Sequence, residues 1–384
     1  MVTVRELQSL LRARGLPVSG KKAVLIQRLQ ASGADLPTPA AVPAVTRSGP
    51  SAADTITREE TPRVASSSAS TLRVASWNIA GLRGLLKRPA GIESLQALVA
   101  NEQVDLLLLQ ETKLQEHMVA EVEPALLNVL NTGDSGHWRA AWACSTARKG
   151  YSGVATLWTD RHSVWGTALA GASCESLPVD PEHEAGQEGR ALIWNLPLPA
   201  GDADASTSGL FSLINVYTPN SGAELRRLDY RCQIWDERFR AAIGRALDAP
   251  AGAAASRVRH ICVGGDLNVA VEDVDFFNPH EKRMERQAGT TPEERESMRR
   301  YTEPPLRLTD AFRCVHGPAS GQYTYWSQRA RNRGRNRGLR LDYFLLSGGL
   351  VGALRDVQHL HTLEGSDHCP VVMELDLAQL RLID

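Results

Sequence analysis

Short apolar runs alternate with amphipathic stretches from Leu72 onward. The apolar runs have the length and composition of β-strands, and they cover Leu72–Ile79, Asp105–Gln110, Gly153–Trp158, Ala191–Asn195, Phe211–Tyr217, His260–Gly264, Leu341–Leu346 and Pro370–Leu375. Helical periodicity covers Ile92–Asn101, Met118–Leu127, Ala223–Leu247 and Pro292–Arg300. Because strand-like and helical segments alternate, the pattern predicts an α/β domain.

The start of the last predicted helix carries additional signals. Thr291 can cap the helix, and Pro292 suits its first turn because the ring fixes a helical backbone angle. Glu293 and Glu294 then lie near the positive end of the helix dipole. These signals place the start of this helix at Pro292.

Two short amphipathic helices are predicted at the N-terminus. Gly15 is suited to end the first helix, and Ser19 to cap the second. Their apolar faces consist of Leu7, Leu10 and Leu11 in the first helix and of Val24, Leu25 and Leu29 in the second. This spacing resembles the SAP motif, a two-helix DNA-binding module, in which Lys21 and Lys22 would face phosphate. The alternative is a helical hairpin with solvated lysines.

A change in composition separates this module from the α/β domain. Residues 35–70 are rich in Pro, Ala, Ser and Thr and have no apolar periodicity, so they cannot bury enough surface to order themselves. The sequence therefore predicts a SAP module at 1–34, a disordered linker at 35–70 and an α/β domain at 71–384.

Charge and cysteine content narrow the function classes only slightly. The formal net charge is −1, so contact with a nucleic acid would have to come from local basic patches. The six cysteines include no C-x-x-C pair, which argues against a thiolate zinc site and is typical of a reducing compartment. No run of about 18 apolar residues occurs, so no membrane span is expected.

Polar residues close two of the predicted strands in the first third of the domain. Asn78 ends one apolar strand although asparagine is a poor strand former, and Glu111 follows a run of buried leucines. A carboxylate at such a place needs a charged partner, and Mg²⁺ is one that binds carboxylates. The alternatives are a turn residue at Asn78 and a salt bridge from Glu111 to Lys113.

Further chemistry-bearing residues follow strands in the second half of the domain. Asp266 can take a proton from water, and Asn268 can hold an oxygen by a hydrogen bond. His368 and Asp342 can form a carboxylate–imidazole pair, while Asp367 can bind metal or protonate a leaving oxygen. Taken singly, these residues suit a Gly-Asp turn or a core histidine. Together they indicate a site, because α/β enzymes build their sites at strand ends.

These motifs resemble the exonuclease III type of apurinic/apyrimidinic endonuclease, within the endonuclease/exonuclease/phosphatase family. Similarity runs from about Leu72 to Leu377. The blocks that carry it are Gly150-Tyr-Ser-Gly-Val, Gln187-Glu-Gly-Arg190, Asn215-Val-Tyr-Thr-Pro-Asn220, Ala288-Gly-Thr-Thr-Pro-Glu-Glu-Arg295 and Leu341-Asp-Tyr-Phe-Leu-Leu346. The resemblance implies a four-layered α/β sandwich, with two packed mixed sheets flanked by helices, and makes 71–384 the catalytic domain.

The resemblance also implies roles for the residues at the strand ends. Glu111 would be the main Mg²⁺ ligand with Asn78 beside it, and Mn²⁺ could substitute. The full set of candidate metal ligands is Asn78, Glu111, Asp266, Asn268, Asp367 and His368. The candidate catalytic residues are Tyr217, Asp266, Asn268, Asp342 and His368. Among them, Asp266 would orient or deprotonate the attacking water, and His368 would stabilise charge on the phosphate.

Recognition of damaged DNA is expected from an aromatic segment and an arginine-rich loop. Residues 329–340 contain six arginines, which favours phosphate contacts over a solvated basic loop. The candidate substrate-binding and DNA-binding residues are Asn220, Tyr325, Trp326, Leu339, Arg340, Arg335, Arg337, Lys21 and Lys22.

Three positions depart from relatives. Ala80 replaces a carboxylate, Leu339 replaces an aromatic residue of animal-type relatives, and Ala223 replaces an arginine that some relatives insert into the duplex.

The resemblance implies a Mg²⁺-dependent endonuclease of base excision repair. Such an enzyme cuts the backbone of double-stranded DNA 5′ to abasic sites and leaves a 3′-hydroxyl, with 3′-phosphodiesterase and 3′→5′ exonuclease side activities. The alternatives are a phosphoinositide phosphatase or deadenylase of the same fold, and a catalytically weak DNA-tethering protein. We expect a monomer located in the nucleus, or alternatively in a plastid or another organelle.

Overall fold

The computed structural model describes residues 11, 16, 28, 71–131, 136–161, 172–198, 209–248 and 259–380. The chain divides into two units, Met1–Thr61 and Pro62–Asp384. In the smaller unit the side chain of Leu11 is fully buried, and the amide of Leu16 donates to its carbonyl at 2.9 Å. The predictions for Gly15, Ser19, Lys21 and Lys22 lie outside the described residues, as does the predicted linker.

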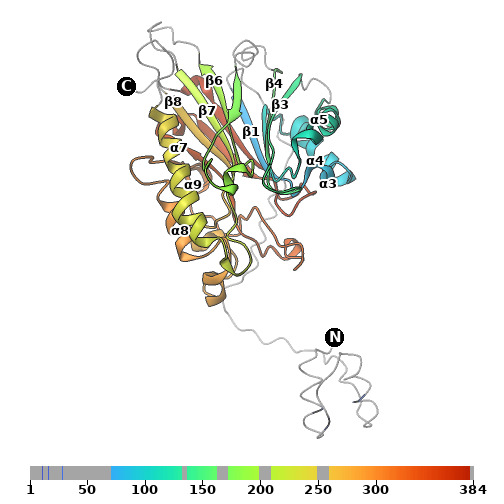
Figure 1. The fold of residues 1–384 in the computed structure, drawn as a ribbon, viewed down its shortest axis with the longest axis vertical. Coiled ribbons are helices and arrows are strands. Elements are labelled where there is room, and N and C mark those ends of the chain that lie inside the picture. Colours follow the sequence, from blue (N-terminus) through green and yellow to red (C-terminus); the bar gives the residue numbers. More distant parts are fainter. Residues whose placement is uncertain are drawn as a thin grey trace, which may run out of the picture. The chain divides into compact units, whose positions relative to one another are not determined.

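Two six-stranded sheets form the larger unit (Figure 1). The first has the order β11 (Leu354–His359), β12 (Val371–Asp376), β1 (Thr71–Asn78), β2 (Leu106–Gln110), β4 (Val154–Thr159) and β3 (Trp138–Ala143). The second has the order β5 (Ser173–Ser176), β6 (Ala191–Leu198), β7 (Gly209–Tyr217), β8 (Arg259–Asp266), β10 (Asp342–Leu346) and β9 (Thr309–Asp310). Two pairs are parallel, β1 with β2 and β7 with β8, and the other paired strands are antiparallel.

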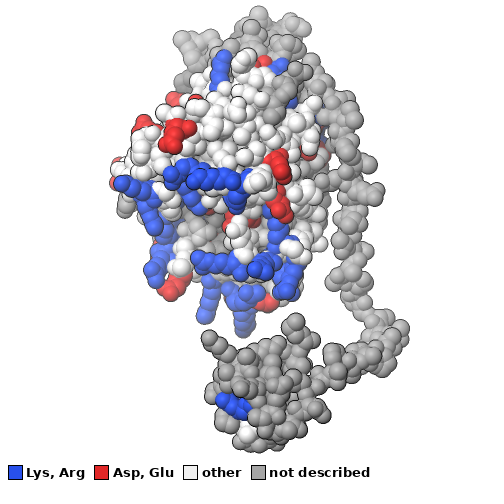
Figure 2. All heavy atoms as spheres, turned by 90° about the vertical axis from the view of Figure 1, so that its right-hand side faces the viewer, with Lys and Arg blue, Asp and Glu red and all other residues white. Residues whose placement is uncertain are grey.

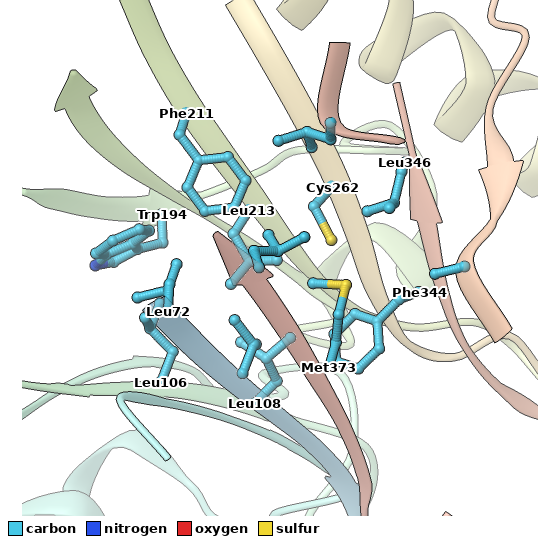
Figure 3. Packing of buried hydrophobic residues seen from close by; sticks show 14 of the residues in the cluster. Leu72, Leu106, Leu108, Trp194, Phe211, Leu213, Cys262, Phe344, Leu346 and Met373 are labelled. Carbon is cyan, nitrogen blue, oxygen red and sulfur yellow. The ribbon is translucent and has the colours of Figure 1, made fainter. Parts of the chain in front are cut away.

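The core between the two sheets consists of side chains from both of them (Figure 3). Leu72, Leu106, Leu108 and Met373 come from the first sheet and meet Trp194, Phe211, Leu213, Cys262, Phe344 and Leu346 from the second. These residues occupy alternate positions along their strands, so one face of each sheet is directed inward. This packing aligns the two sheets and brings corresponding strand ends to one edge.

Helices cover the outer faces of both sheets (Figure 1). On the first sheet, α3 (Leu82–Leu85), α4 (Pro89–Ala100) and α5 (Glu116–Leu130) bury leucines against β1 and β2. On the second, α7 (Asp236–Asp248) packs against β7 and β8, with α8 (Pro292–Arg299) beside it. The short helices α9 (Ala311–His316) and α10 (Gly348–Val351) contribute Phe312 and Leu350 to the core between the sheets. The predicted four-layered sandwich is therefore confirmed. None of the helices among the described residues is long and apolar enough to cross a membrane.

Short helical turns complete the described part of the fold. They are η1 (Glu184–Gln187), η2 (Ala223–Leu225), η3 (Tyr230–Trp235), η4 (Asp273–Asp275), η5 (Lys282–Arg286), η6 (Arg333–Arg335) and η7 (Leu377–Gln379). The single helix predicted over Ala223–Leu247 is wrong. Glu224 and Leu225 have φ of 57°, which ends η2, and the chain then forms the π-helix η3 before α7 begins. Periodicity alone could not reveal this break, because the apolar residues continue across it.

Candidate active site

The predicted site residues converge because parallel strands end at the same edge of each sheet. Asn78 ends β1 and pairs with Gln110 at the end of β2, directly before Glu111. In the second sheet, Tyr217 at the end of β7 pairs with Asp266 at the end of β8. Asp342 begins the antiparallel β10 and lies opposite Asp266. These pairings bring side chains from the ends of five strands to one end of the sandwich.

Close backbone contact beneath the site depends on Gly265. Its φ is 146°, and an added Cβ atom would lie 2.0 Å from the carbonyl oxygen of Val216 on β7. Only glycine fits such an approach. Gly265 therefore lets β8 lie close to β7, so that Asp266 pairs with Tyr217 at the strand ends.

Glu111 is held by three donors. The phenol of Tyr217 donates to its Oε1 at 2.8 Å, and Nδ2 of Asn78 donates to the same oxygen at 3.0 Å. The ammonium of Lys113 lies 2.8 Å from Oε2. Burial raises the pKa of Glu111, but the charge of Lys113 and these hydrogen bonds together lower it by more, so its pKa lies below the ordinary value. Glu111 is therefore a fixed, ionised carboxylate.

The same Asn78 amide links Glu111 to a second carboxylate. Its Nδ2 donates to Oδ2 of Asp266 at 2.9 Å, while its Oδ1 accepts from the Ala80 amide at 3.0 Å. Burial raises the pKa of Asp266 to about 7, although the charge of His368 opposes the shift. A carboxylate with a pKa near neutrality is suited to accept a proton from water.

The predicted carboxylate–imidazole pair is confirmed. Nδ1 of His368 lies 2.7 Å from Oδ2 of Asp342, and its Nε2 lies 3.8 Å from Oδ2 of Asp266. Burial lowers the pKa of His368, but the two carboxylates raise it to about 10. The imidazole is thus a cation at neutral pH. The role of His368 as a metal ligand stays a prediction, and it requires the ring to release this proton because ligation uses a neutral nitrogen.

Two asparagines lie beside Asp266. Nδ2 of Asn220 donates to Oδ1 of Asn268 at 2.8 Å, and Nδ2 of Asn268 donates to the carbonyl of Thr218 at 2.9 Å. Asn268 is buried, whereas Asn220 is exposed. The pair therefore presents the Asn220 amide to solvent beside Asp266. Asp367 is half-buried beside His368, and its Oδ1 accepts from Ser366.

Backbone strain is concentrated around these residues. Five non-glycine residues near the strand ends have φ between 51° and 55°, a conformation that side chains disfavour. They are Ala80, Glu111, Lys113, Ser152 and Asn268. Such conformations persist where surrounding contacts fix them, and they are common at active sites.

Comparison with known proteins is consistent with this geometry. A model described as the Endonuclease/Exonuclease/phosphatase family matches residues 75–368. The chain belongs to this family. A SAP domain model matches residues 1–32, so the family domain follows an N-terminal SAP domain.

Two relatives and one solved structure support the assignment to the endonuclease/exonuclease/phosphatase family, and a second solved structure shares the fold. The chain is 34% identical over 312 residues to the DNA repair nuclease APEX1 of Danio rerio, covering 80% of this chain and 83% of that protein. It is 32% identical to an exodeoxyribonuclease of Bacillus subtilis, covering 80% and 100%. The crystal structure of the AP endonuclease LMAP of Leishmania major matches with a TM-score of 0.65 at 32% identity, covering 80% and 88%. The Xenopus laevis APE2 catalytic domain, at 22% identity and a TM-score of 0.60 over 79% and 92%, shares the fold.

Several DNA-binding predictions fall on residues with other roles in this family member. Arg340 is 1% exposed, and it donates to Oδ1 of Asp275 at 2.7 Å and lies 2.8 Å from Asp310. Trp326 is 3% exposed and donates to Asn336. The predictions that Arg340 and Trp326 contact DNA are wrong, because both side chains are buried and bonded within the protein.

The remaining predicted contacts are nearer the surface. Arg335 and Arg337 are exposed on the loop before β10. The ring of Tyr325 lies 5.0 Å from that of His368, centroid to centroid, and packs on the mostly buried Leu339. Tyr325 thus forms a wall beside His368, and Leu339 supports it from behind.

The individual side chains of a basic cavity next to Tyr217 were not predicted. The cavity has a volume of about 350 Å³, and Tyr151, Glu188 and Arg227 line it. Buried Arg190 donates to Tyr151 at 3.0 Å and to the carbonyl of Tyr217 at 2.9 Å. Three of these side chains lie in the blocks Gly150–Val154 and Gln187–Arg190, but the sequence did not reveal that they meet.

A network of two amides between the sheets was also missed. Nε2 of Gln110 donates to Oδ1 of Asn215 at 2.8 Å, and Nδ2 of Asn215 donates to the carbonyl of Ala155 at 2.8 Å. All three residues are buried. The network joins β2 and β4 to β7 below the site, so it fixes the distance between the candidate site residues of the two sheets.

The donor set fits a hard divalent cation. Oxygens of Glu111 and Asp266 lie within 3.0 Å of one Asn78 nitrogen, and the Lys113 ammonium already shows that Glu111 attracts a cation. Such oxygen donors suit Mg²⁺ or Mn²⁺. Asp266, Asp342 and His368 also lie close enough together to suggest a metal site. Their hydrogen bond and the charge on His368 make an ion-pair cluster the better interpretation.

Proposed function

We propose that the protein is a metal-dependent DNA repair nuclease that uses Mg²⁺ to hydrolyse the DNA backbone 5′ to abasic sites. The observation that carries this proposal is the grouping at Asn78, where one amide joins the ionised Glu111 to Asp266, beside the cationic His368. Phosphodiester hydrolysis needs a base for water and positive charge for the phosphate, and the site offers both. The family membership and the named relatives support the same reaction class.

Each side chain has a place in the reaction. Asp266 accepts a proton from the attacking water, whose oxygen forms the new bond to phosphorus. The imidazolium of His368 neutralises charge that develops on the phosphate oxygens, and Asp342 holds its ring in place. Asn220 donates its second amide hydrogen to the phosphate, and Asn268 holds the Asn220 amide in place. Bound at Glu111, Mg²⁺ would supply Lewis-acid stabilisation of negative charge.

The bond that breaks joins phosphorus to the 3′ oxygen of the preceding nucleotide. A proton must reach that oxygen from water, and Asp367 beside His368 is suited to relay it. The products are a 3′-hydroxyl and a 5′-deoxyribose phosphate. Side activities as a 3′-phosphodiesterase and a 3′→5′ exonuclease follow from the same chemistry at strand ends.

A basic surface around the site supports DNA as the substrate. Lys and Arg side chains surround a hollow in the lower half of the larger unit in Figure 2. Four exposed arginines on the loop before β10 add to the basic surface: Arg329, Arg331, Arg335 and Arg337. Such charges position DNA through its phosphates. An abasic sugar has no base to unpair, so its extrusion against Tyr325 costs little.

Cleavage of a defined duplex tests this proposal. The substrate carries one tetrahydrofuran abasic analogue, which cannot undergo β-elimination, so only hydrolysis produces a cut. We expect one cut 5′ to the analogue, with a product that a DNA polymerase extends directly because it ends in a 3′-hydroxyl. Glu111→Gln and His368→Ala should lose this cut while retaining binding.

Two other outcomes would change the proposal. Binding without cleavage by the wild-type protein would favour a tethering protein that acts through its SAP domain. Cleavage of intact and abasic duplexes at equal rates would favour a general nuclease. Action as a monomer, and residence in the nucleus or alternatively in a plastid or another organelle, remain parts of the proposal that imaging and sedimentation would test.

A further inference from the structure

Lys113 makes an unusual contact at the centre of the site. Its ammonium lies 2.8 Å from Oε2 of Glu111 and donates to the carbonyl of Ala80 at 3.2 Å. The other oxygen of Glu111 is occupied by Asn78 and Tyr217. Oε2 is therefore the oxygen that faces a cation in this structure, and the cation is the lysine itself.

The only acceptor that position 80 gives to Lys113 is a backbone oxygen. The alanine side chain offers no oxygen, so no second carboxylate competes with Glu111 for the lysine there. Ala80, Glu111 and Lys113 all have positive φ, between 51° and 55°. The backbone thus fixes the lysine and the glutamate in facing positions.

We infer that Lys113 is an internal competitor of the divalent cation at Glu111, and that it sets how tightly this enzyme binds its metal. The inference rests on the proposed function, because it takes Glu111 as the metal ligand. An ammonium and a hard divalent cation both need the free oxygen of this carboxylate. The lysine must therefore leave Oε2 before the cation can bind there.

Lys113 is suited to exchange with a cation. Its side chain is 36% exposed, and its charge lies at the end of a flexible four-carbon chain. The lysine can therefore move into solvent without disturbing the core. In the metal-free protein Lys113 holds the Glu111 carboxylate in a fixed orientation, so less ordering is needed when the metal binds. The same contact lowers the affinity of Glu111 for the metal, because the cation must displace the lysine.

Binding of MnCl₂ to the full-length, EDTA-treated protein tests this inference by isothermal titration calorimetry. We expect Lys113→Met to bind Mn²⁺ about three- to fivefold more tightly, as the loss of one partly exposed ion pair predicts. Lys113→Arg keeps the charge and should stay within about twofold of wild type. Lys282→Met removes an exposed lysine of η5 and serves as the matched control, with unchanged affinity.

Further variants separate failure of this inference from failure of the proposed function. Unchanged or weaker Mn²⁺ binding by Lys113→Met would overturn the role of Lys113, and Lys113→Gln replaces it if thermal melting shows that the methionine variant does not fold. In a Glu111→Gln background, Lys113→Met should have no further effect. If Glu111→Gln itself binds Mn²⁺ as tightly as wild type, Glu111 is not the ligand, and the proposed metal site is overturned instead.

Discussion

Two buried aspartates of the larger unit have opposite electrostatic surroundings. Asp275 is fully buried between Arg340 and Arg313, and although burial raises its pKa, Arg340 and then Arg313 lower it below the ordinary value. Asp266 is buried to the same degree, but burial raises its pKa to about 7, although the positive charge of His368 opposes this shift. Asp275 therefore belongs to a charge-balanced cluster that stabilises the fold, whereas Asp266 is suited to accept a proton.

The pKa values of the two aspartates differ because the balance of positive and negative charges around them differs. Around Asp275, two arginines face two aspartates, the second being Asp310. In the site, the carboxylates outnumber the cations His368 and Lys113, since they include Glu111, Asp266, Asp342 and Asp367. A balanced cluster gains nothing from another cation, but a cluster with excess negative charge attracts one. The same residue types thus stabilise the fold in one place and bind a metal in the other.

Removing the base should have the largest effect on activity. Asp266→Asn keeps the shape of the side chain and one of its two accepting oxygens but cannot accept a proton, so single-turnover cleavage should fall by about 10²–10⁴-fold. Folding stability should remain close to wild type or rise, because one unbalanced carboxylate is lost. A variant with near-normal cleavage would show that Asp266 is not the base.

Breaking the balanced cluster should have the reverse effect. Arg340→Leu leaves Asp275 and Asp310 buried with too little positive charge, which should lower the free energy of unfolding by about 3–5 kcal/mol. Cleavage per folded molecule, measured at low temperature, should change little. Urea titration gives the stability, and an unchanged midpoint would contradict the structural role of Arg340.

The charge on His368 can be measured directly. Burial lowers its pKa, but Asp342 and Asp266 raise it from 6.5 to about 10, so NMR of the metal-free protein should find the ring protonated at neutral pH. Because the folded-state pKa exceeds the ordinary value, this pair stabilises the fold below about pH 6.5, and the contribution is lost as the pH rises toward 10. Asp342→Asn should lower the pKa markedly. A wild-type ring that titrates near 6.5 would refute the pair's assigned role.

The exposed arginines should have the smallest effect. Arg335→Ser and Arg337→Ser should each weaken DNA binding modestly and reduce the slope of log affinity against log salt by about one. Binding to abasic and intact duplexes should weaken equally, because phosphate contacts carry no information on the damage. Fluorescence anisotropy over a range of salt concentrations measures both quantities. An unchanged slope would place these residues outside the interface.

The sequence predicted the strands that carry the site but not every part of its surroundings. All eight predicted strands form, because each is an apolar run that is buried on both faces or on one. The missed strands β3, β5, β9 and β11 are short or polar, and tertiary pairing alone stabilises them. The capping signal at Thr291 was sufficient for α8, since its hydroxyl accepts from the Glu294 amide and the buried Glu294 carboxylate accepts from the Thr291 amide.

Site residues at strand ends were predictable because strand order brings them together. The roles of the arginines were less predictable, since the sequence alone does not distinguish an exposed arginine from a buried one. Arg335 and Arg340 belong to one basic stretch, yet the first is exposed and the second pairs with Asp275 from a distant segment. The partner acids lie 30 to 65 positions away, so only the folded chain reveals the difference.

The most direct test of the account is single-turnover cleavage of the tetrahydrofuran duplex by EDTA-treated protein, with MgCl₂ added in steps. We predict no cut without Mg²⁺, one cut 5′ to the analogue with it, and a loss of that cut in Glu111→Gln at every Mg²⁺ concentration. Cleavage that persists in EDTA, or that Glu111→Gln carries out at the wild-type rate, would contradict a metal-dependent site at Glu111.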